Sequence, residues 1–249
     1  MQFNPKISII TVVYNGHSLI ERTINSVLSQ TYTNIEYIII DGASSDGTLE
    51  LAEKYQHLIA VILSGKDNGI YDAMNKGLNI ATGDYVLFLN AGDELYSPQT
   101  ISTVFSFGDA DVYYGNTAVV NEHGLFLGDR RLSPPEHLNW KSLRYGMCVS
   151  HQSFIARRSF CEQYNLDYSI SADIDWMISV LKKSIKIVNT KNYISKFLEG
   201  GASHKQRKSA LGERFTIMTK HYGFIQTLFN HIYILFRYPF HKVSKKSMT

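Results

Sequence analysis

Residues 84–96 read Asp-Tyr-Val-Leu-Phe-Leu-Asn-Ala-Gly-Asp-Glu-Leu-Tyr, an apolar run that leads directly into oxygen-bearing side chains. The continuous apolar run at residues 86–89 is typical of a short strand that is covered on both faces of a sheet. Asn90, Asp93 and Glu94 lie where that strand must end. Because open α/β sheets bind ligands beyond the carboxyl ends of their strands, this stretch predicts a site at the edge of such a sheet.

Three apolar segments earlier in the chain alternate with segments of helical periodicity. The expected strands are Ile7–Val13, Ile35–Ile40 and Leu58–Leu63, and the expected helices are His17–Gln30, a segment from residues 45–48 to about Tyr55, and Gly69–Ala81. Strands that alternate with helices form parallel sheets, because a helix usually makes the crossover between parallel strands. The sequence therefore predicts an α/β fold with a doubly wound, mostly parallel sheet.

The chain after residue 97 is less regular. The expected strands there are Val112–Tyr114, Thr117–Val120 and Val149–Ile155, with a break at Pro134-Pro135. We expect residues 98–203 to extend the sheet that residues 1–97 begin, so that residues 1–203 form one domain. Residues 204–249 are expected to form a separate helical tail.

The positive charge of the chain is concentrated in this tail. The net charge of the whole chain is +3, yet residues 204–249 hold nine lysines and arginines and a single acid, Glu213. Apolar residues fall at helical spacing in the tail, namely Ile225, Leu228, Phe229, Ile232 and Phe236. Such a helix either lies on a membrane surface with anionic lipids or packs on the domain with its basic end in solvent. We expect no nucleic-acid partner, because no nucleic-acid-binding motif accompanies these charges.

The composition is that of an ordinary soluble enzyme, with 44% hydrophobic and 19% charged residues. Two cysteines, Cys148 and Cys161, are too few for a disulfide framework and lack metal-ligand spacing, so we expect reduced thiols in a cytoplasmic protein. The first residues show no charged segment followed by an apolar one, and no uncharged apolar run of about 18 residues occurs. We expect a chain that is neither secreted nor membrane-spanning.

Polar residues follow three of the expected strands, at residues 11–15, 41–48 and 90–94. The carboxyl ends of parallel strands share one edge of a sheet, so these clusters outline one crevice that fits a nucleotide and a divalent cation. The turn after the first strand reads Val-Val-Tyr-Asn-Gly-His at residues 12–17, which is not the Gly-x-Gly-x-x-Gly of dinucleotide sites. The phosphate-binding loop Gly-x-x-x-x-Gly-Lys-Ser/Thr is also absent from the sequence.

Four blocks of sequence carry a resemblance to a known family. They are Ile7–Asn15, Asp-Gly-Ala-Ser-Ser-Asp-Gly-Thr at 41–48, Asp-Asn-Gly-Ile-Tyr-Asp-Ala-Met-Asn-Lys-Gly at 67–77, and Gly83–Asp93. In this order, over about residues 5–200, the chain resembles the family-2 inverting glycosyltransferases of the GT-A fold. The last two blocks are most similar to a bacterial branch associated with exopolysaccharide assembly, including colanic-acid-type transferases. The resemblance implies a Rossmann-like half at residues 1–97 that binds the nucleotide-sugar, an acceptor-side half at residues 98–203, and helices at the C-terminus.

The resemblance implies a donor site for a nucleoside-diphosphate sugar, with UDP the favoured nucleotide. Thr11 and Tyr14 would border the nucleobase, and Asp41 would accept a hydrogen bond from a uracil-like ring. Asn68 and Asp72 would line the ribose and the diphosphate.

The resemblance also implies a divalent cation, Mn²⁺ or Mg²⁺, held by an Asp-x-Asp motif. The corresponding run here is Asn90-Ala91-Gly92-Asp93, which lacks a charge at both usual carboxylate positions. Asp93 is then the best metal ligand and Asn90 a weaker oxygen donor, so metal dependence is expected to be weakened. The alternative for Asp93 is a cap on the helix that follows.

An inverting transfer needs a general base for the acceptor hydroxyl. By position in the family pattern, Asp173 matches this base, although the glutamate that usually precedes it is Ala172 here. Asp175 is the reserve candidate. The alternative for both acids is a favourable interaction with the dipole in the first turn of a helix that includes Met177–Leu181.

Three other segments have two readings each. Trp176 either stacks on an acceptor sugar or packs in the core, and His151-Gln152 either face a substrate or are buried and satisfied. The segment 200–205 resembles a loop that closes over the donor diphosphate, with His204 in contact with metal or phosphate and Lys205 or Arg207 as a cationic partner. Its alternative is a glycine linker before the last helix.

The sequence thus predicts an enzyme that transfers a sugar, with inversion, to a hydroxyl of a glycan or lipid-linked acceptor in bacterial surface polysaccharide synthesis. We expect it in the cytoplasm or on the inner face of the cell membrane. A nucleotidyltransferase would need a glycine-rich, basic loop after the first strand, which is absent. A non-catalytic binder of nucleotide-sugar or glycan remains the alternative, because Asn90, Gly92 and Ala172 stand where the family has carboxylates.

Overall fold

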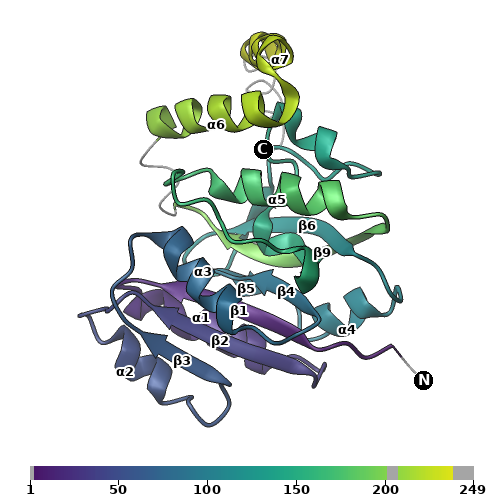
Figure 1. Ribbon diagram of the computed structural model, residues 1–249. Helices are drawn as coiled ribbons and strands as arrows, with labels where there is room; N and C mark the ends of the chain where they lie inside the picture. The colour runs from purple at the N-terminus through teal and green to yellow at the C-terminus, as the bar shows by residue number, and fades with distance from the viewer. Residues whose placement is uncertain (1–2, 201–206, 238–249) are drawn as a thin grey trace, which may run out of the picture.

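The computed structural model describes residues 3–200 and 207–237, whose strands form one curled sheet with helices on both faces (Figure 1). The order of the strands is β3-β2-β1-β4-β8-β6-β9-β5, and β7 pairs with β6. This arrangement confirms the expected α/β fold.

The first half of the chain supplies the parallel part of the sheet. Its strands are β1 (Ile7–Val13), β2 (Ile35–Asp41), β3 (Val61–Ser64) and β4 (Tyr85–Phe88), and its helices are α1 (His17–Leu28), α2 (Thr48–Glu53) and α3 (Ile70–Ile80). Neighbouring strands of this group pair in parallel. Their carboxyl ends therefore lie at one edge of the sheet, as the sequence predicts.

Alternation along the buried strands divides the core into two layers. Ile10 of β1 packs in the same cluster as Met74 of α3, whereas its neighbour Ile9 packs with Ile20 of α1 on the other face. Both faces of β1, β2 and β4 are covered, so these strands are mostly apolar.

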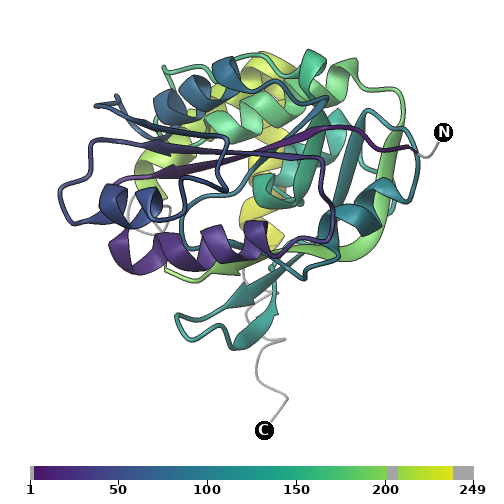
Figure 2. The same ribbon diagram turned by 90° about the horizontal axis from the view of Figure 1, so that it is seen from below.

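The second half is mixed in direction. It contains β5 (Glu94–Leu95), α4 (Thr100–Phe105), β6 (Val112–Val120), β7 (Phe126–Asp129), β8 (Phe154–Arg157), α5 (Ala172–Lys183) and β9 (Ile187–Leu198), with short 3-10 turns η1 (Trp140–Tyr145), η2 (His151–Ser153) and η3 (Arg158–Phe160). β8 runs antiparallel to β4 and β6, while β6 and β9 pair in parallel over almost their whole length. The β6–β7 hairpin projects from the body of the molecule (Figure 2).

The three strands expected in the second half proved different in the structure. The expected pair at 112–114 and 117–120 is one strand, β6, whose register shifts at Gly115. A β-carbon on Gly115 would lie 2.4 Å from the carbonyl oxygen of Asn192, so only glycine allows β9 to approach this closely. The expected strand at 149–155 is instead the 3-10 turn η2 followed by β8. Ser153 N donates a hydrogen bond to Ser150 O at 2.9 Å, which turns the chain before the strand begins.

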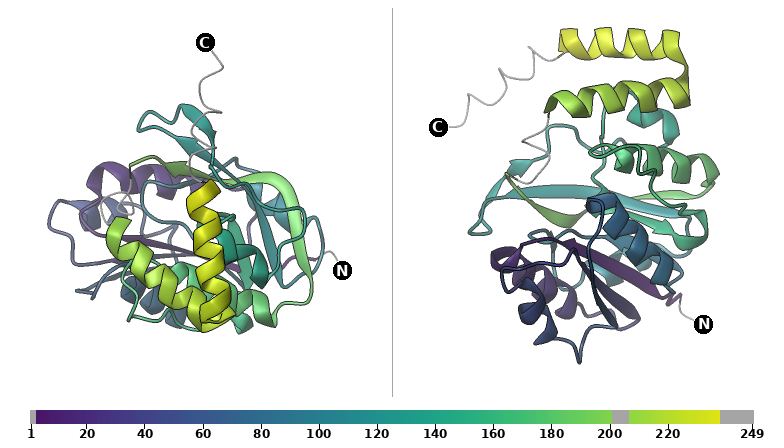
Figure 3. Two further views of the ribbon diagram at one scale, coloured as in Figure 1. Left: turned by 90° about the horizontal axis from the view of Figure 1, so that it is seen from above. Right: turned by 60° about the vertical axis from the view of Figure 1, so that its left-hand side comes forward.

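The last two helices form an outer layer over α5 (Figure 3). Helix α6 (Arg207–Tyr222) buries Ile217 and Met218 in the core that α5 shares, and α7 (Phe224–Arg237) packs on α6. Much of α7 remains uncovered, with Ile225 71% and Phe229 63% exposed. Among the described helices, none has the length and apolar character needed to cross a membrane.

Candidate active site

Only one of the two carboxylate oxygens of Asp41, at the end of β2, has hydrogen-bond partners among the described residues. Its Oδ2 accepts hydrogen bonds from Ser44 N at 3.1 Å and Ser64 Oγ at 2.6 Å. Its Oδ1 is buried and has no partner among the described residues. A buried oxygen without a donor is costly, so this atom is suited to accept an N–H from a ligand.

The ring of Tyr14 and the loop that begins at Asp67 both approach Gly42, the residue after Asp41. Tyr14 is 68% exposed, and a β-carbon on Gly42 would lie 3.3 Å from Tyr14 Cδ2 and 2.8 Å from Asp67 Oδ2. Glycine at position 42 thus lets the ring of Tyr14 and the loop that begins at Asp67 close around the end of β2. This corner can hold a flat, hydrogen-bonding ring against Tyr14.

The loop before α3 is ordered by its own acids. Asn68 N donates to Asp72 Oδ2 at 2.9 Å, and Lys76 Nζ lies 3.5 Å from the same oxygen. Gly69 N donates to Asp67 Oδ1 at 3.1 Å. The structure therefore brings Asn68 and Asp72 together beside the Asp41 corner, while Asp67, to which the sequence assigned no role, lies closest to Gly42.

Thr11 does not join this group. It is fully buried, and its hydroxyl lies 3.1 Å from the Tyr37 hydroxyl in the core below α1. Residue 11 follows Ile9 by two positions, so its side chain points to the same covered face of β1. The role of Thr11 at the nucleobase stays a prediction that its burial does not favour.

Asp93 lies in a buried network between the two halves of the sheet. Gln152 Nε2 donates to its Oδ2 at 2.7 Å, and Leu198 N donates to its Oδ1 at 3.0 Å. Burial raises the pKa of Asp93 to about 6, although these two hydrogen bonds oppose the rise. Its carboxylate does not cap α4, which begins seven residues later at Thr100.

The residues at this position fit a divalent cation only in part. The described residues contain no group of three or more His, Cys, Asp or Glu side chains that could hold a metal ion. Asn90 Oδ1, however, is buried without a partner, and a cation would relieve the cost of an ionised Asp93. Mg²⁺ is often bound by one or two carboxylates together with substrate phosphates, so Asn90 and Asp93 suit an ion that the substrate helps to hold.

His151 connects the metal candidate to the base candidate. Its Nε2 lies 3.2 Å from Asn90 Nδ2, and its Nδ1 lies 3.3 Å from Asp173 Oδ2. With the Asn90 amide donating to Nε2, the proton of a neutral His151 resides on Nδ1 and faces Asp173. Asp173 is only 14% exposed and lies in the first turn of α5.

Asp175 serves a different purpose two residues later. His221 Nε2 lies 2.6 Å and Lys220 Nζ 3.0 Å from its Oδ1, so it ties α5 to α6. Burial opposes ionisation of Asp175, but His221 and Lys220 hold its pKa below the usual value. The structure does not bring Asp175 to Asp173, and its role as reserve base is not favoured.

The remaining candidates divide clearly. Trp176 is 3% exposed and stacks on Tyr164 with ring centroids 5.2 Å apart, which is core packing. His204 lies outside the described residues, as does most of the proposed loop. The sequence analysis did not select Arg130 and Arg214. Burial lowers the pKa of both arginines, and the negative charge of Asp173 opposes this effect. The only sequence signal for Arg130 was its place in an irregular, basic loop.

Comparison with known proteins bears on this site. The model of the glycosyl transferase family 2 matches residues 8–164. A PGL/p-HBAD biosynthesis glycosyltransferase of Mycobacterium bovis (strain BCG / Pasteur 1173P2) is 32% identical over 188 residues, which cover 70% of this chain and 69% of that protein. The UDP-Glc:alpha-D-GlcNAc-diphosphoundecaprenol beta-1,3-glucosyltransferase WfaP of Escherichia coli is 29% identical over 185 residues, with 74% and 73% covered.

Solved structures share the fold. S. aureus TarS 1-349 in complex with UDP superposes with a TM-score of 0.69 at 18% identity and covers 86% of this chain. The chain spans only 64% of that TarS chain. The mannosyltransferase PcManGT from Pyrobaculum calidifontis, in complex with GDP-Man and Mn²⁺, gives a TM-score of 0.67 at 16% identity, with 95% of this chain and 72% of that chain covered.

Proposed function

Because this chain belongs to glycosyl transferase family 2, we propose that it transfers a sugar, with inversion, from a nucleoside-diphosphate sugar to a hydroxyl of a glycan or lipid-linked acceptor. One observation carries the proposal. His151 contacts both Asn90 and Asp173. Asn90 lies beside the metal candidate Asp93, and Asp173 is the base candidate. The group that would hold the cation and the group that would take the acceptor proton are therefore close together.

The donor nucleotide is assigned to the corner of Tyr14 and Asp41 in residues 1–97. The open Oδ1 of Asp41 accepts an N–H of the base, while Tyr14 packs against its face. Asn68 N donates to Asp72 Oδ2 beside this corner, and we assign these two residues to the ribose and the diphosphate. A uracil ring offers the N–H that Asp41 needs, and the TarS structures with UDP and UDP-GlcNAc support UDP as the first nucleotide to test.

Asp93 and Asn90 would hold the divalent cation together with the donor diphosphate. A bound Mn²⁺ or Mg²⁺ supplies positive charge that stabilises the departing nucleoside diphosphate. The PcManGT complex with Mn²⁺ supports a search for this ion. With a single carboxylate at the site, we expect weaker metal affinity than an Asp-x-Asp motif gives.

Asp173 acts as the general base in residues 98–203. The acceptor hydroxyl loses its proton to Asp173 as its oxygen forms a bond to the anomeric carbon, and the bond to the diphosphate oxygen breaks on the opposite face. Attack from that face inverts the anomeric centre. The Nδ1–H of His151 holds the Asp173 carboxylate in position for this transfer.

A lipid-linked acceptor places the reaction at a membrane surface. The exposed apolar side chains of α7 and the lysines at 242, 245 and 246 suit the inner face of a bacterial membrane, where anionic lipids attract basic segments. The printed activity of WfaP, on a diphosphoundecaprenol-linked sugar, supports this class of acceptor. Assembly of a surface polysaccharide, as in the colanic-acid-type branch, is the corresponding pathway class.

A non-catalytic nucleotide-sugar or glycan binder is the second candidate. It is favoured by Asn90 and Ala172, which replace carboxylates that the family usually carries. Such a protein would bind the donor and form no product in any acceptor mixture.

The donor site is tested by calorimetry with UDP, GDP, dTDP and CDP, each with and without Mn²⁺. We expect selective binding to one nucleotide that Mn²⁺ strengthens, and we expect Asp93→Ala to remove the effect of Mn²⁺. The exposed acid Glu50 offers a matched control, since Glu50→Ala removes the same group from the surface of α2. Failure of every nucleotide to bind would overturn the assignment of the donor site.

A further inference from the structure

Among the residues that the structure describes, Arg130 in the acceptor-side half has no counterion. The Nη1 atom of Arg130 is buried and has no hydrogen-bond partner among the described residues. An arginine side chain cannot shed its charge in a protein, so a buried, unpaired guanidinium is expensive. In the described part of the chain, no acid lies within ion-pair distance of Arg130.

A second arginine strengthens the positive field. Arg214 of α6 is half-buried, and it too forms no ion pair within the described ranges 3–200 and 207–237. Burial lowers the pKa of both Arg130 and Arg214, and Asp173 is the acid whose charge opposes this in both. Among the described residues, Asp173 forms an ion pair with neither arginine, and it accepts hydrogen bonds from His151 and Ile174 N.

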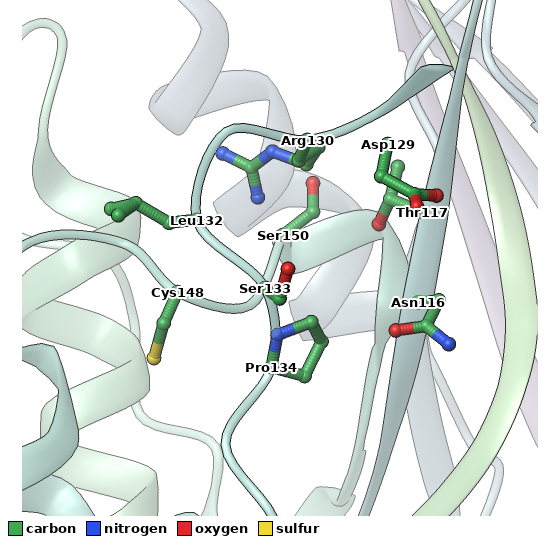
Figure 4. Close-up of a pocket in the computed structure, with 9 residues that line it drawn as sticks. All are labelled: Asn116, Thr117, Asp129, Arg130, Leu132, Ser133, Pro134, Cys148 and Ser150. Atoms are coloured by element: carbon green, nitrogen blue, oxygen red, sulfur yellow. The ribbon is translucent and has the colours of Figure 1, made fainter. Parts of the chain in front are cut away.

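Arg130 lines a small polar pocket, drawn in Figure 4. The pocket holds about 60 Å³, which is small beside the roughly 300 to 1,000 Å³ of most ligand pockets, so it suits a small oxyanion better than a sugar ring. The hydroxyl of Ser150 faces Arg130 across it. Ser150 donates to Gln152, whose amide donates to Asp93, so the wall of this pocket is also a wall of the active site.

The surrounding elements belong to the acceptor side. The loop after β7 carries Arg130, the segment before β8 carries Ser150, and α6 carries Arg214. The nucleotide corner at Asp41 and Tyr14 lies at the far end of β1 and β2, in the other half of the sheet. Helix α6 continues directly into α7, whose exposed apolar side chains suit a lipid.

We propose that the Arg130 pocket is an oxyanion site for the phosphate group of the acceptor. Arg214 adds positive charge beside it, since a β-carbon on Gly146 would lie 3.2 Å from Arg214 Nη2 and 2.9 Å from Cδ1 of the pocket residue Leu132. The proposal rests on the proposed function and names the acceptor class more closely. A phosphate here is bound by the Arg130 guanidinium, in a pocket whose Ser150 is joined through Gln152 to Asp93, so the acceptor is held at the wall of the active site. The chemistry required of the acceptor is a sugar linked to a phosphate or diphosphate.

The test uses inorganic pyrophosphate as the probe and calorimetry on the full chain, first with saturating UDP and then without it. We expect pyrophosphate to bind in both conditions, and we expect Arg130→Gln and Arg214→Gln each to weaken it by about 10- to 100-fold. UDP binding should be unchanged in both variants. Lys186→Gln, which removes an exposed charge elsewhere, should leave pyrophosphate binding as in the wild type.

The other outcomes separate the sources of the oxyanion. Competition between pyrophosphate and UDP would assign the arginines to the donor diphosphate and overturn the proposal. Binding of glucuronate in place of pyrophosphate would assign them to a sugar carboxylate, with the same result. UDP binding without pyrophosphate binding would defeat this inference alone, whereas loss of both would defeat the proposed function. Arg130→Lys, which keeps the charge, should restore part of the affinity and shows that a loss in Arg130→Gln is not misfolding.

Discussion

The two ends of the candidate site leave opposite kinds of polar group without a partner. Within the part of the chain that the structure describes, the unpaired atoms at the nucleotide end are acceptors, Asp41 Oδ1 and Asn90 Oδ1, whereas at the acceptor end Arg130 Nη1 is an unpaired donor. An unpaired acceptor calls for an N–H or a cation, and an unpaired guanidinium nitrogen calls for an oxyanion. The pattern of missing partners thus describes what each end is built to bind.

The largest effect is expected for a substitution of Asp173, the base candidate at the acceptor end. Asp173→Asn removes the proton acceptor but keeps the shape of the side chain, so we expect kcat to fall by roughly 10³-fold. The affinity for the donor nucleotide should stay within about twofold, because the Asp41 corner is untouched. Steady-state kinetics and calorimetry on the same sample measure both quantities. Near-normal turnover in this variant would remove Asp173 from the chemistry.

A smaller effect is expected at the nucleotide end. Asp41→Ala removes the open Oδ1, and we expect the affinity for UDP to fall by about 10- to 100-fold, the worth of a hydrogen bond to a charged group. Ser64→Ala is the matched control, because it removes a donor to Oδ2 and leaves Oδ1 in place. Equal losses in the two variants would mean that Asp41 orders its loop and does not contact the base.

The smallest effect is expected for Asp175, the second acid in the first turn of α5, where we expect a loss of stability and no loss of transfer. Asp175→Asn weakens the contact with His221 and Lys220, so we expect the free energy of unfolding to fall by about 1 to 2 kcal/mol while transfer continues. The pKa of Asp175 is lowered in the folded state, so its contribution is present above the unfolded value near 3.8 and is lost as the pH falls further. Urea unfolding at pH 7 and at pH 3 measures the difference. A variant that is inactive yet fully stable would move Asp175 into the site.

Local pattern predicted the parallel half of the sheet well. The bounds of β1 match the β-branched run Ile7–Val13, and the fold that the alternation of strands and helices predicted is confirmed. Strand β9 was missed, because Ile187–Leu198 is interrupted by lysines and asparagines and is held by pairing with a strand far away in the sequence. Distant pairing of this kind leaves no local periodicity to read.

The sequence predicted the site residues that belong to a motif and missed those that only the three-dimensional contacts identify. The sequence selected Asp93, His151 and Asp173, which the structure links through Gln152 and Asn90. It did not foresee that Asp175 meets His221, because the partner lies 46 positions further along the chain. The only sequence signal for Arg130 was its place in an irregular, basic loop, and it is the burial of its Nη1 that distinguishes it from a surface arginine.

The parallel pairing of β6 with β9 has a consequence for how the protein forms. Residues 121–186 lie between these strands and contain Arg130, His151 and Asp173. The pairing therefore closes a long loop, and closing such loops is entropically costly and slow. The Asp41 corner depends only on strands that emerge early in synthesis, so it can assemble first. We expect the growing chain to acquire a nucleotide pocket before it acquires a base, and to become an enzyme only when its last strand is in place.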